Sequence, residues 1–195
     1  GAVSDPKMLR RMKSIGGTSV EQYVTWESCE RSGEGMWDFS AWDAEVEKIR
    51  AAGLKWLPFL IAGPAYSLPE WYRESRDFTG FRCLEHNLES KIQSLWDRTF
   101  QKYIERFLVA FKEHYKDVSI FEGLLFGISG DFGEALVPIW HGNWPTIIPG
   151  LYHSHYGFWC NDRFARTNFV EIAKTRFSDL NELNSRWETE FKSFE

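Results

Sequence analysis

Apolar residues follow two patterns along the chain, and the two patterns alternate. Spacings of three and four residues predict amphipathic helices, whereas short runs of apolar or β-forming residues predict strands. The helices are expected over residues 5–15, 40–52, 87–115, 162–177 and 178–187. The strands are expected over residues 18–26, 54–61 and 120–128. The charged face of the longest helix, which includes Arg106, is expected to be solvated.

Short polar side chains precede each helical pattern, where they can accept hydrogen bonds from free backbone N–H groups. These expected N-caps are Asp5, Ser40, Asn87, Asp162 and Ser178. Gly16 and Gly53 follow the first two helices, as is typical of helix C-termini.

The alternation of strands and helices predicts an α/β fold with a parallel sheet. The longest loops follow strands, which favours a (β/α) barrel of the TIM type over a doubly wound sheet. No nucleotide-binding glycine motif follows a strand. We expect one domain over residues 1–195, with about three to four of the eight βα units of a barrel. Since a full barrel takes about 250 residues, the rest of the barrel is expected to come from the same or another polypeptide.

Charge and cysteine content narrow the possible partners. The formal net charge is -5 and no basic cluster is present, so nucleic acid is not an expected partner. No apolar stretch is long enough to cross a bilayer, so no membrane partner is expected. The 3 cysteines are too few, and odd in number, for a disulfide-stapled fold, and they leave the compartment unknown.

Aromatic residues make up 17% of the chain and include 10 tryptophans. Sugar rings stack their C–H faces on aromatic planes, so this content is typical of a carbohydrate-binding protein. A large aromatic core explains the same composition equally well.

Residues 123–134, GLLFGISGDFGE, combine a strand pattern with two acids. An apolar run ends in glycines and then offers Asp131 and Glu134. Parallel α/β enzymes present catalytic groups at the carboxyl edge of the sheet in this way, so Glu134 is the candidate catalytic acid. Asp131 is favoured as a turn-former, although it could be the acid itself or could raise the pKa of Glu134.

Other candidates for substrate binding lie at the ends of strands. Tyr23, Trp26 and Glu27 end the first strand and could supply a sugar platform and a hydroxyl acceptor. Core packing explains Tyr23 and Trp26 equally well, so Glu27 is the more informative of the three.

The loops after the later strands carry further aromatic and polar side chains. Trp71, Trp140, His141 and Trp144 are expected to contact substrate, and one or two of the tryptophans to stack on sugar. Trp159 lies in the same loops, and the tryptophans that do not stack on sugar are expected to pack the loops down.

Three parts of the sequence resemble barrel glycoside hydrolases. Residues 37–43, WDFSAWD, leading to residues 51–57, AAGLKWL, resemble the second helix and third strand of those enzymes. Residues 127–134 resemble their fourth strand, which carries an acid/base glutamate. The phrase over residues 177–187 resembles family 42 β-galactosidases, and the stretch around Glu134 is similar to the G-P-x-G-E of family 14 β-amylases.

This resemblance implies a retaining hydrolysis of β-linked sugars such as β-galactosides, with Glu134 as general acid/base. The nucleophile lies on the seventh strand of such enzymes, so it is expected outside this chain. The family pattern usually has Asn before the glutamate, whereas this chain has Gly133, as the β-amylase pattern does. The alternatives are a non-catalytic carbohydrate-binding protein on a degenerate barrel and an inverting α-glucan hydrolase of the β-amylase type.

No cofactor and no metal are expected. His153 and His155 have the spacing of metal ligands, but the sequence offers no convincing third and fourth ligand. The cysteine cluster that binds structural zinc in some family 42 members is absent, although Cys160 is present.

Overall fold

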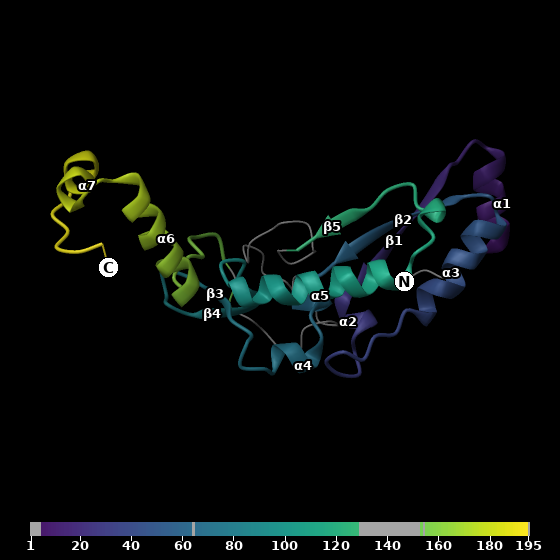
Figure 1. Cartoon of the computed structure of the whole chain (residues 1–195), viewed down its shortest axis with the longest axis horizontal. Coiled ribbons are helices and arrows are strands. Elements are labelled where there is room, and N and C mark those ends of the chain that lie inside the picture. Colours follow the sequence, from purple (N-terminus) through teal and green to yellow (C-terminus); the bar gives the residue numbers. More distant parts are fainter. Residues whose placement is uncertain (1–4, 64, 129–152, 154, 195) are drawn as a thin grey trace.

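The computed structural model describes residues 5–63, 65–128, 153 and 155–194 (Figure 1). Its main sheet contains three parallel strands in the order β1-β2-β5. These are β1 (Ser19–Thr25), β2 (Lys55–Ile61) and β5 (Leu125–Gly127). The predicted parallel sheet is therefore confirmed.

Helices connect and flank these strands. The long ones are α1 (Pro6–Ser14), α3 (Ser40–Ala51), α5 (Arg98–His114), α6 (Arg163–Arg176) and α7 (Leu180–Trp187). Short turns of helix are α2 (Trp26–Cys29), η1 (Ala65–Ser67), α4 (Glu70–Arg73) and η2 (Val118–Ile120). Two antiparallel strands, β3 (Gly80–Arg82) and β4 (Glu89–Gln93), form a separate hairpin before α5.

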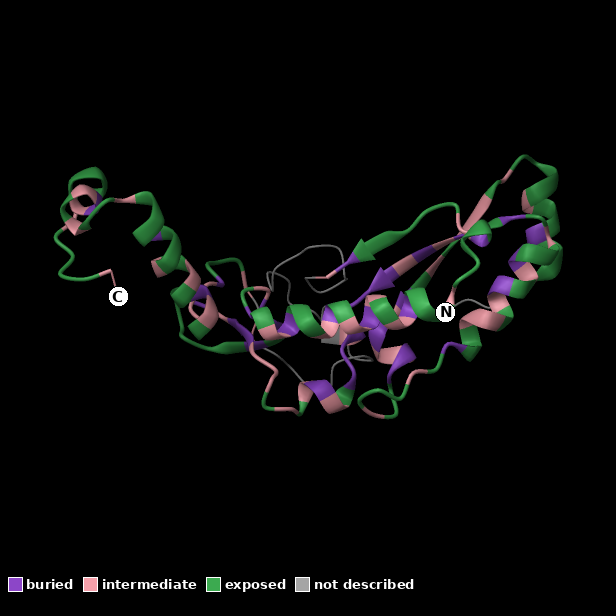
Figure 2. Cartoon of the chain, in the orientation of Figure 1, coloured by how far each residue is buried: buried purple, intermediate pink, exposed green. Residues whose placement is uncertain are grey.

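The main core lies between the sheet and α5, where apolar side chains at helical spacing meet the central strand. Trp56 and Leu60 of β2 are fully buried, as are Phe107 and most of Phe111 on α5. Figure 2 shows this burial concentrated on β2 and on one face of α5. In the described part of the chain, much of the aromatic content therefore packs the core.

The predicted helix over residues 87–115 is wrong in its first third. Asn87 adopts a left-handed conformation, with φ of 56°, in the turn of the hairpin. α5 begins only at Arg98, after Asp97, whose carboxylate accepts the N–H of Thr99 at 2.8 Å. Ile92 continues the helical spacing of α5, but it also fits the alternation of a strand, and pairing with β3 decides for the strand.

The third strand is also shorter than predicted. The apolar run over residues 120–128 contains η2 and a single bridge between Phe121 and Trp56 before β5 begins at Leu125. Within the described residues β5 pairs only with β2, and Leu125 and Phe126 are exposed. An apolar run therefore does not by itself set the length of a strand.

Two predicted N-caps are confirmed and two are shifted by one residue. Asp5 accepts the N–H of Lys7, and Asp162 accepts the N–H groups of Phe164 and Ala165. In α3 the N-cap is Phe39 rather than Ser40, and in α7 it is Asp179 rather than Ser178. These shifts follow from acids at the neighbouring positions, since the Asp38 carboxylate accepts the N–H of Ser40 and Asp179 caps α7 itself.

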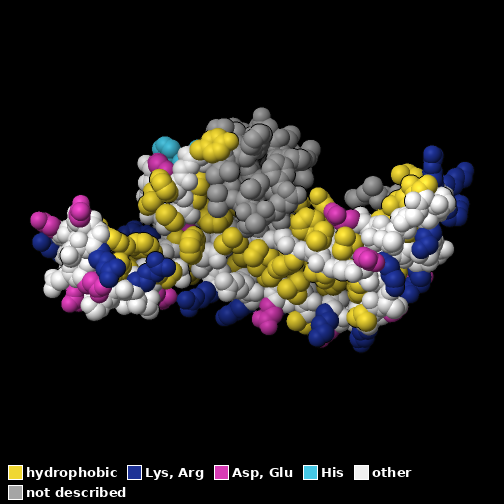
Figure 3. Space-filling view, turned by 90° about the horizontal axis from the view of Figure 1, so that it is seen from above, with side chains coloured by type: hydrophobic (Ala, Val, Ile, Leu, Met, Phe, Trp, Pro, Cys, Tyr) yellow, Lys and Arg dark blue, Asp and Glu magenta, His cyan; other side chains and the backbone are white. Residues whose placement is uncertain are grey.

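The two C-terminal helices, α6 and α7, lie at one end of the molecule, away from the sheet (Figure 1). Most of their residues are exposed (Figure 2). Large apolar side chains also reach the surface elsewhere, as Figure 3 shows for one face. Among the described helices, none has the length and apolar character needed to cross a membrane.

Candidate functional site

The carboxyl ends of the three parallel strands meet at one edge of the sheet. Thr25 pairs with Ile61, and Ile61 pairs with Gly127. Just beyond these residues the N–H of Ala62 donates to the Gly127 carbonyl at 2.9 Å. Gly63 lies against the carbonyl of Ile128 so closely that an added Cβ would collide with it. A side chain at Gly63 would therefore force the ends of β2 and β5 apart.

Glu27 lies at this edge, in the first turn of α2, two residues after the end of β1. Its carboxylate accepts hydrogen bonds from Arg31, at 2.7 Å from Nε and 3.0 Å from Nη2, and from the Ser28 hydroxyl. The hydrogen bond and the charge of Glu27 raise the pKa of the Arg31 guanidinium. The predicted position is thus correct, but the charge of Glu27 is already paired.

Of the two aromatic candidates on β1, Trp26 is fully buried and Tyr23 is half-exposed. The indole of Trp26 contacts Tyr72 and Phe100, which leaves no free face for a sugar ring. For Trp26 the structure therefore favours core packing over a sugar platform. Tyr23 is next to Val24, a sheet-core residue, so its ring points to the opposite face of the sheet.

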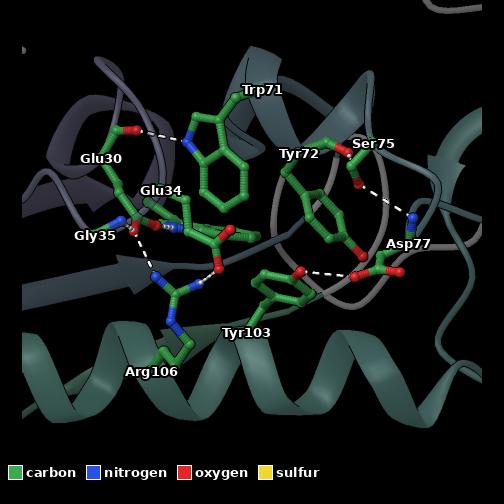
Figure 4. Close-up of polar contacts among 10 residues, drawn as sticks. Glu30, Glu34, Gly35, Trp71, Tyr72, Ser75, Asp77, Tyr103 and Arg106 are labelled. Atoms are coloured by element: carbon green, nitrogen blue, oxygen red, sulfur yellow. Dashed lines mark hydrogen bonds and ion pairs between the residues drawn. The ribbon is translucent and has the colours of Figure 1, made fainter.

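A buried ion pair, missed by the sequence analysis, supports this edge (Figure 4). Glu30 is fully buried, and its carboxylate accepts hydrogen bonds from Arg106 at 2.7 Å and from the indole N–H of Trp26 at 2.6 Å. The backbone N–H of Gly35 donates to the same carboxylate. Arg106 also contacts Glu34 at 3.2 Å. The helical position of Arg106 predicted a solvated face. The ion pair with buried Glu30 shows that this prediction is wrong for Arg106.

Trp71 and Tyr103 extend this arrangement toward the loop after β2 (Figure 4). The indole N–H of half-buried Trp71 donates to the Glu30 carbonyl at 2.8 Å, and the Tyr103 hydroxyl donates to Asp77 at 2.8 Å. Burial, together with the hydrogen bond to Asp77, raises the pKa of Tyr103 to about 12. Tyr103 therefore remains a donor at neutral pH. These contacts tie the loops after β1 and β2 to α5.

The remaining sequence candidates lie outside the described residues. They are Asp131, Glu134, Trp140, His141 and Trp144. The described part of β5 ends at Gly127, on the same edge as Thr25 and Ile61. Trp159, one of the four loop tryptophans, is buried against Phe81 and Ile92, so packing rather than sugar stacking explains it.

His153 and His155 have two further potential ligands beside them, contrary to expectation. Donor atoms of Cys83, His86, His153 and His155 all lie within 4.8 Å of one another. The Cys83 sulfur lies 3.2 Å from Nε2 of His153. Burial raises the pKa of the Cys83 thiol, but the adjacent His155 imidazole and backbone N–H groups outweigh it and lower that pKa to about 5. The sequence missed this group because Cys83 and His153 are 70 residues apart.

Comparisons with curated proteins identify β-amylases, while no family model matches the chain. A thermophilic β-amylase from Thermoanaerobacterium thermosulfurigenes is 21% identical over 197 residues, which cover 95% of this chain and 35% of that protein. A β-amylase from Cytobacillus firmus is 22% identical over 202 residues, which cover 96% of this chain and 42% of that protein. The chain thus spans less than half the length of these relatives.

Comparison with solved structures also finds glycoside hydrolases, and it shows the fold of the chain. The catalytic domain of a β-amylase from Paenibacillus polymyxa matches 100% of this chain and 50% of its own, with a TM-score of 0.77 and 22% identity. A β-galactosidase from Rahnella sp. R3 matches 95% of this chain and 24% of its own, with a TM-score of 0.66 and 14% identity. The chain therefore has the fold of part of the (β/α) barrel found in these glycoside hydrolases.

Proposed function

We propose that this chain forms part of the catalytic barrel of a glycoside hydrolase and that Glu134 is its general acid. The observation that carries the proposal is the register of the sheet. It brings the carboxyl ends of β1, β2 and β5 to one edge, and the chain continues from β5 toward Glu134. Catalytic residues of (β/α) barrels occupy this edge.

The chemistry requires two carboxyl groups. One protonates the departing glycosidic oxygen, and the other acts either as a nucleophile about 5 Å away or as a base for water roughly 6.5–9.5 Å away. Glu27 and Glu30 are poor candidates for the second role, because Arg31 and Arg106 already pair their charges. The second carboxylate therefore comes from outside the described residues. Asp131 is proposed to contact substrate or to adjust the pKa of Glu134.

The similarities favour an α-glucan over a β-galactoside as substrate. The two curated relatives described above are both β-amylases, and the β-amylase structure also has the higher TM-score. We therefore favour an inverting, β-amylase-like enzyme. A retaining enzyme for β-galactosides is the second candidate, supported by the β-galactosidase-like phrase over residues 177–187 and by the matching fold of the Rahnella enzyme.

For substrate contacts we propose Tyr23 and the loop residues after β2 and β5. The Tyr23 ring is half-exposed near the carboxyl end of β1, which suits stacking on a sugar. Trp71 can offer only the part of its ring that Tyr72 and Tyr103 leave uncovered. Trp140, His141 and Trp144 complete the proposed set.

The remainder of a barrel is proposed to cover the edge formed by β5. In the described residues this strand has β2 as its one partner, and Leu125 and Phe126 are about 40% exposed. An apolar, half-paired strand is a surface that another strand normally covers.

The decisive variant is Glu134→Gln in the full-length protein. Loss of a general acid is expected to lower kcat by about 10²–10⁴-fold on maltooligosaccharides, because their leaving groups need a proton. The loss should be smaller on aryl glycosides whose leaving groups are more acidic. The matched control is Glu122→Gln, which changes an exposed acid on the amino-terminal side of β5 and should retain most of the activity. Equal rates for Glu134→Gln and the natural protein would reject the assignment.

Product analysis separates the candidate classes. Proton NMR of the first product should show the inverted anomer for the β-amylase type and the retained anomer for the β-galactosidase type. Sugar binding in calorimetry with no hydrolysis of either substrate class would identify a non-catalytic binding protein and overturn the proposal.

A further inference from the structure

Four potential metal ligands converge between the β3–β4 hairpin and the segment that precedes α6. Cys83 and His86 belong to the turn of the β3–β4 hairpin, and His153 and His155 precede α6. The Cys83 sulfur lies 3.2 Å from His153 Nε2 and 3.8 Å from His86 Nδ1. We call these four residues the His/Cys cluster.

The imidazole rings of the cluster meet edge to face rather than in a stack. The ring centroid of His86 lies 5.2 Å from that of His153, with an interplanar angle of 90°. It lies 4.8 Å from the ring centroid of His155, with an interplanar angle of 81°. His153 and His155 are 4.9 Å apart at 61°. Together with donor atoms inside 4.8 Å, this arrangement directs ring nitrogens toward one common space.

His155 supplies an independent observation that points to a ligand. Its Nδ1 lies 2.9 Å from the Tyr156 carbonyl, which can only accept, so the proton is on Nδ1. The lone pair is then on Nε2, which is buried and accepts no hydrogen bond from the residues that the structure describes. Leaving such a group unsatisfied costs about 1–3 kcal/mol. A metal ion would bind this nitrogen, and the Tyr156 carbonyl would orient the ring as outer partners of metal-bound histidines do.

The two segments that carry the ligands are held in register by hydrogen bonds. The N–H of Leu84 donates to the Phe158 carbonyl at 2.9 Å, and the N–H of Phe158 donates to the Glu85 carboxylate at 2.8 Å. The N–H of Asn161 donates to the Arg82 carbonyl at 2.9 Å. The ligands are thus presented by a fixed framework rather than by independent side chains.

Gly157 allows the close approach at the centre of this framework. A Cβ at this position would lie 2.5 Å from the Glu85 carboxylate and 2.6 Å from the His155 ring. Trp159 holds the other side of His155, since its indole N–H donates to the His155 carbonyl at 3.1 Å. Both contacts fix the position of the imidazole.

We propose that Cys83, His86, His153 and His155 bind a zinc ion at a closed structural site. A thiolate with three imidazoles is a tetrahedral zinc donor set, whereas calcium and magnesium prefer oxygen ligands. Zn–S and Zn–N bonds of about 2.3 and 2.0 Å place donor atoms roughly 3.3–3.6 Å apart. The observed spacings require only small shifts to reach that geometry.

The zinc ion would fasten the segment after the proposed catalytic loop to the hairpin. His153 follows the residues that include Glu134, so the metal would fix the C-terminal end of that loop. Four protein ligands leave no open position for substrate, which is why a structural rather than catalytic role follows. This role is independent of the sugar that the enzyme cleaves.

Metal content tests the proposal directly. Untagged full-length protein should contain one zinc per chain by mass spectrometry, and the chelated protein should regain one equivalent from ZnCl₂. With CoCl₂ it should develop a thiolate-to-cobalt charge-transfer band. Cys83→Ser should abolish this band, and the matched variant Cys160→Ser should keep it. His86→Ala, at an exposed position, should weaken cobalt affinity by more than about 100-fold without unfolding the chain.

Two results would overturn the proposal. One is protein that neither contains zinc nor takes up cobalt after chelation. The other is a cobalt complex whose spectrum and affinity are unchanged in folded His86→Ala. If Cys83→Ser does not fold, His86→Ala with its control His114→Ala decides the outcome, because His114 contacts Asp43 outside the cluster. Catalytic activity is not a readout, so failure here leaves the role of Glu134 untouched.

Discussion

The sheet core and the hairpin core of this protein differ greatly in what holds them together. The sheet core contains large buried side chains from β1, β2, α3 and α5, including Trp26, Trp56 and Phe107. The hairpin core has four buried members among the described residues, namely Phe81, Cys83, Ile92 and Trp159. Apolar burial can therefore stabilise the sheet core, whereas the hairpin core needs additional interactions to hold its segments together.

The physical reason is the small size of the hairpin core. A cluster of a few apolar side chains rarely compensates for the entropy of ordering two segments, and small units commonly add a metal or a disulfide. Both Cys83 and Cys160 are free thiols. Two further interactions would hold the hairpin to the segment before α6. One is the set of hydrogen bonds between these two segments, and the other is the proposed zinc ion.

The sharpest way to break this comparison is to truncate one phenylalanine in each core. Phe107→Ala should lower the free energy of unfolding by about 3–5 kcal/mol, because Phe107 is fully buried in the sheet core. Phe81→Ala should change the urea midpoint much less, because the hairpin can open locally while the sheet stays folded. Equal shifts in the midpoint would show that the two cores unfold as one unit.

A second variant probes the polar part of the sheet core. Glu30→Gln removes one partner of a buried ion pair. Because the Arg106 side chain is one-third exposed, water partly solvates the charge that loses its partner. We therefore expect the free energy of unfolding to fall by about 3 kcal/mol, near the lower end of the usual range. Glu34→Gln is the matched control, since Glu34 is 59% exposed and contacts the same guanidinium, and it should cost below about 1 kcal/mol. Chemical denaturation of both variants measures the difference. A loss for Glu34→Gln as large as that for Glu30→Gln would contradict the assignment.

The smallest expected effect concerns α7, whose residues belong to neither core. Hydrogen bonds from the backbone N–H and hydroxyl of Ser178 lower the pKa of Glu182. A carboxyl whose folded pKa is depressed stabilises the fold above its ordinary pKa and loses that contribution as pH falls through the lowered value. Protection of the α7 amides against exchange, corrected for the intrinsic rate at each pH, should therefore fall as pH drops below the ordinary range of a glutamate pKa. Glu182→Gln should remove most of this pH dependence, while the sheet core stays unaffected.

Several elements could be predicted because their signals are local. Asp5 and Asp162 cap their helices with side chains adjacent to the N–H groups that they accept. The apolar run of β2 and the alternating pattern of β1 similarly need no knowledge of distant residues. Asn87 misled the prediction because a residue favoured at helix caps also tolerates the left-handed turn of a hairpin.

By itself the sequence determined the parallel sheet, the helices that flank it and the segment that leads to Glu134, but it did not reveal the β3–β4 hairpin. These follow from spacing and propensity, which act over a few residues. Only the tertiary structure decided that Glu30 pairs with Arg106 and that Cys83 meets His153, because 76 and 70 residues separate these partners. Such contacts depend on how the segments pack in space, and no local pattern encodes the choice of partner.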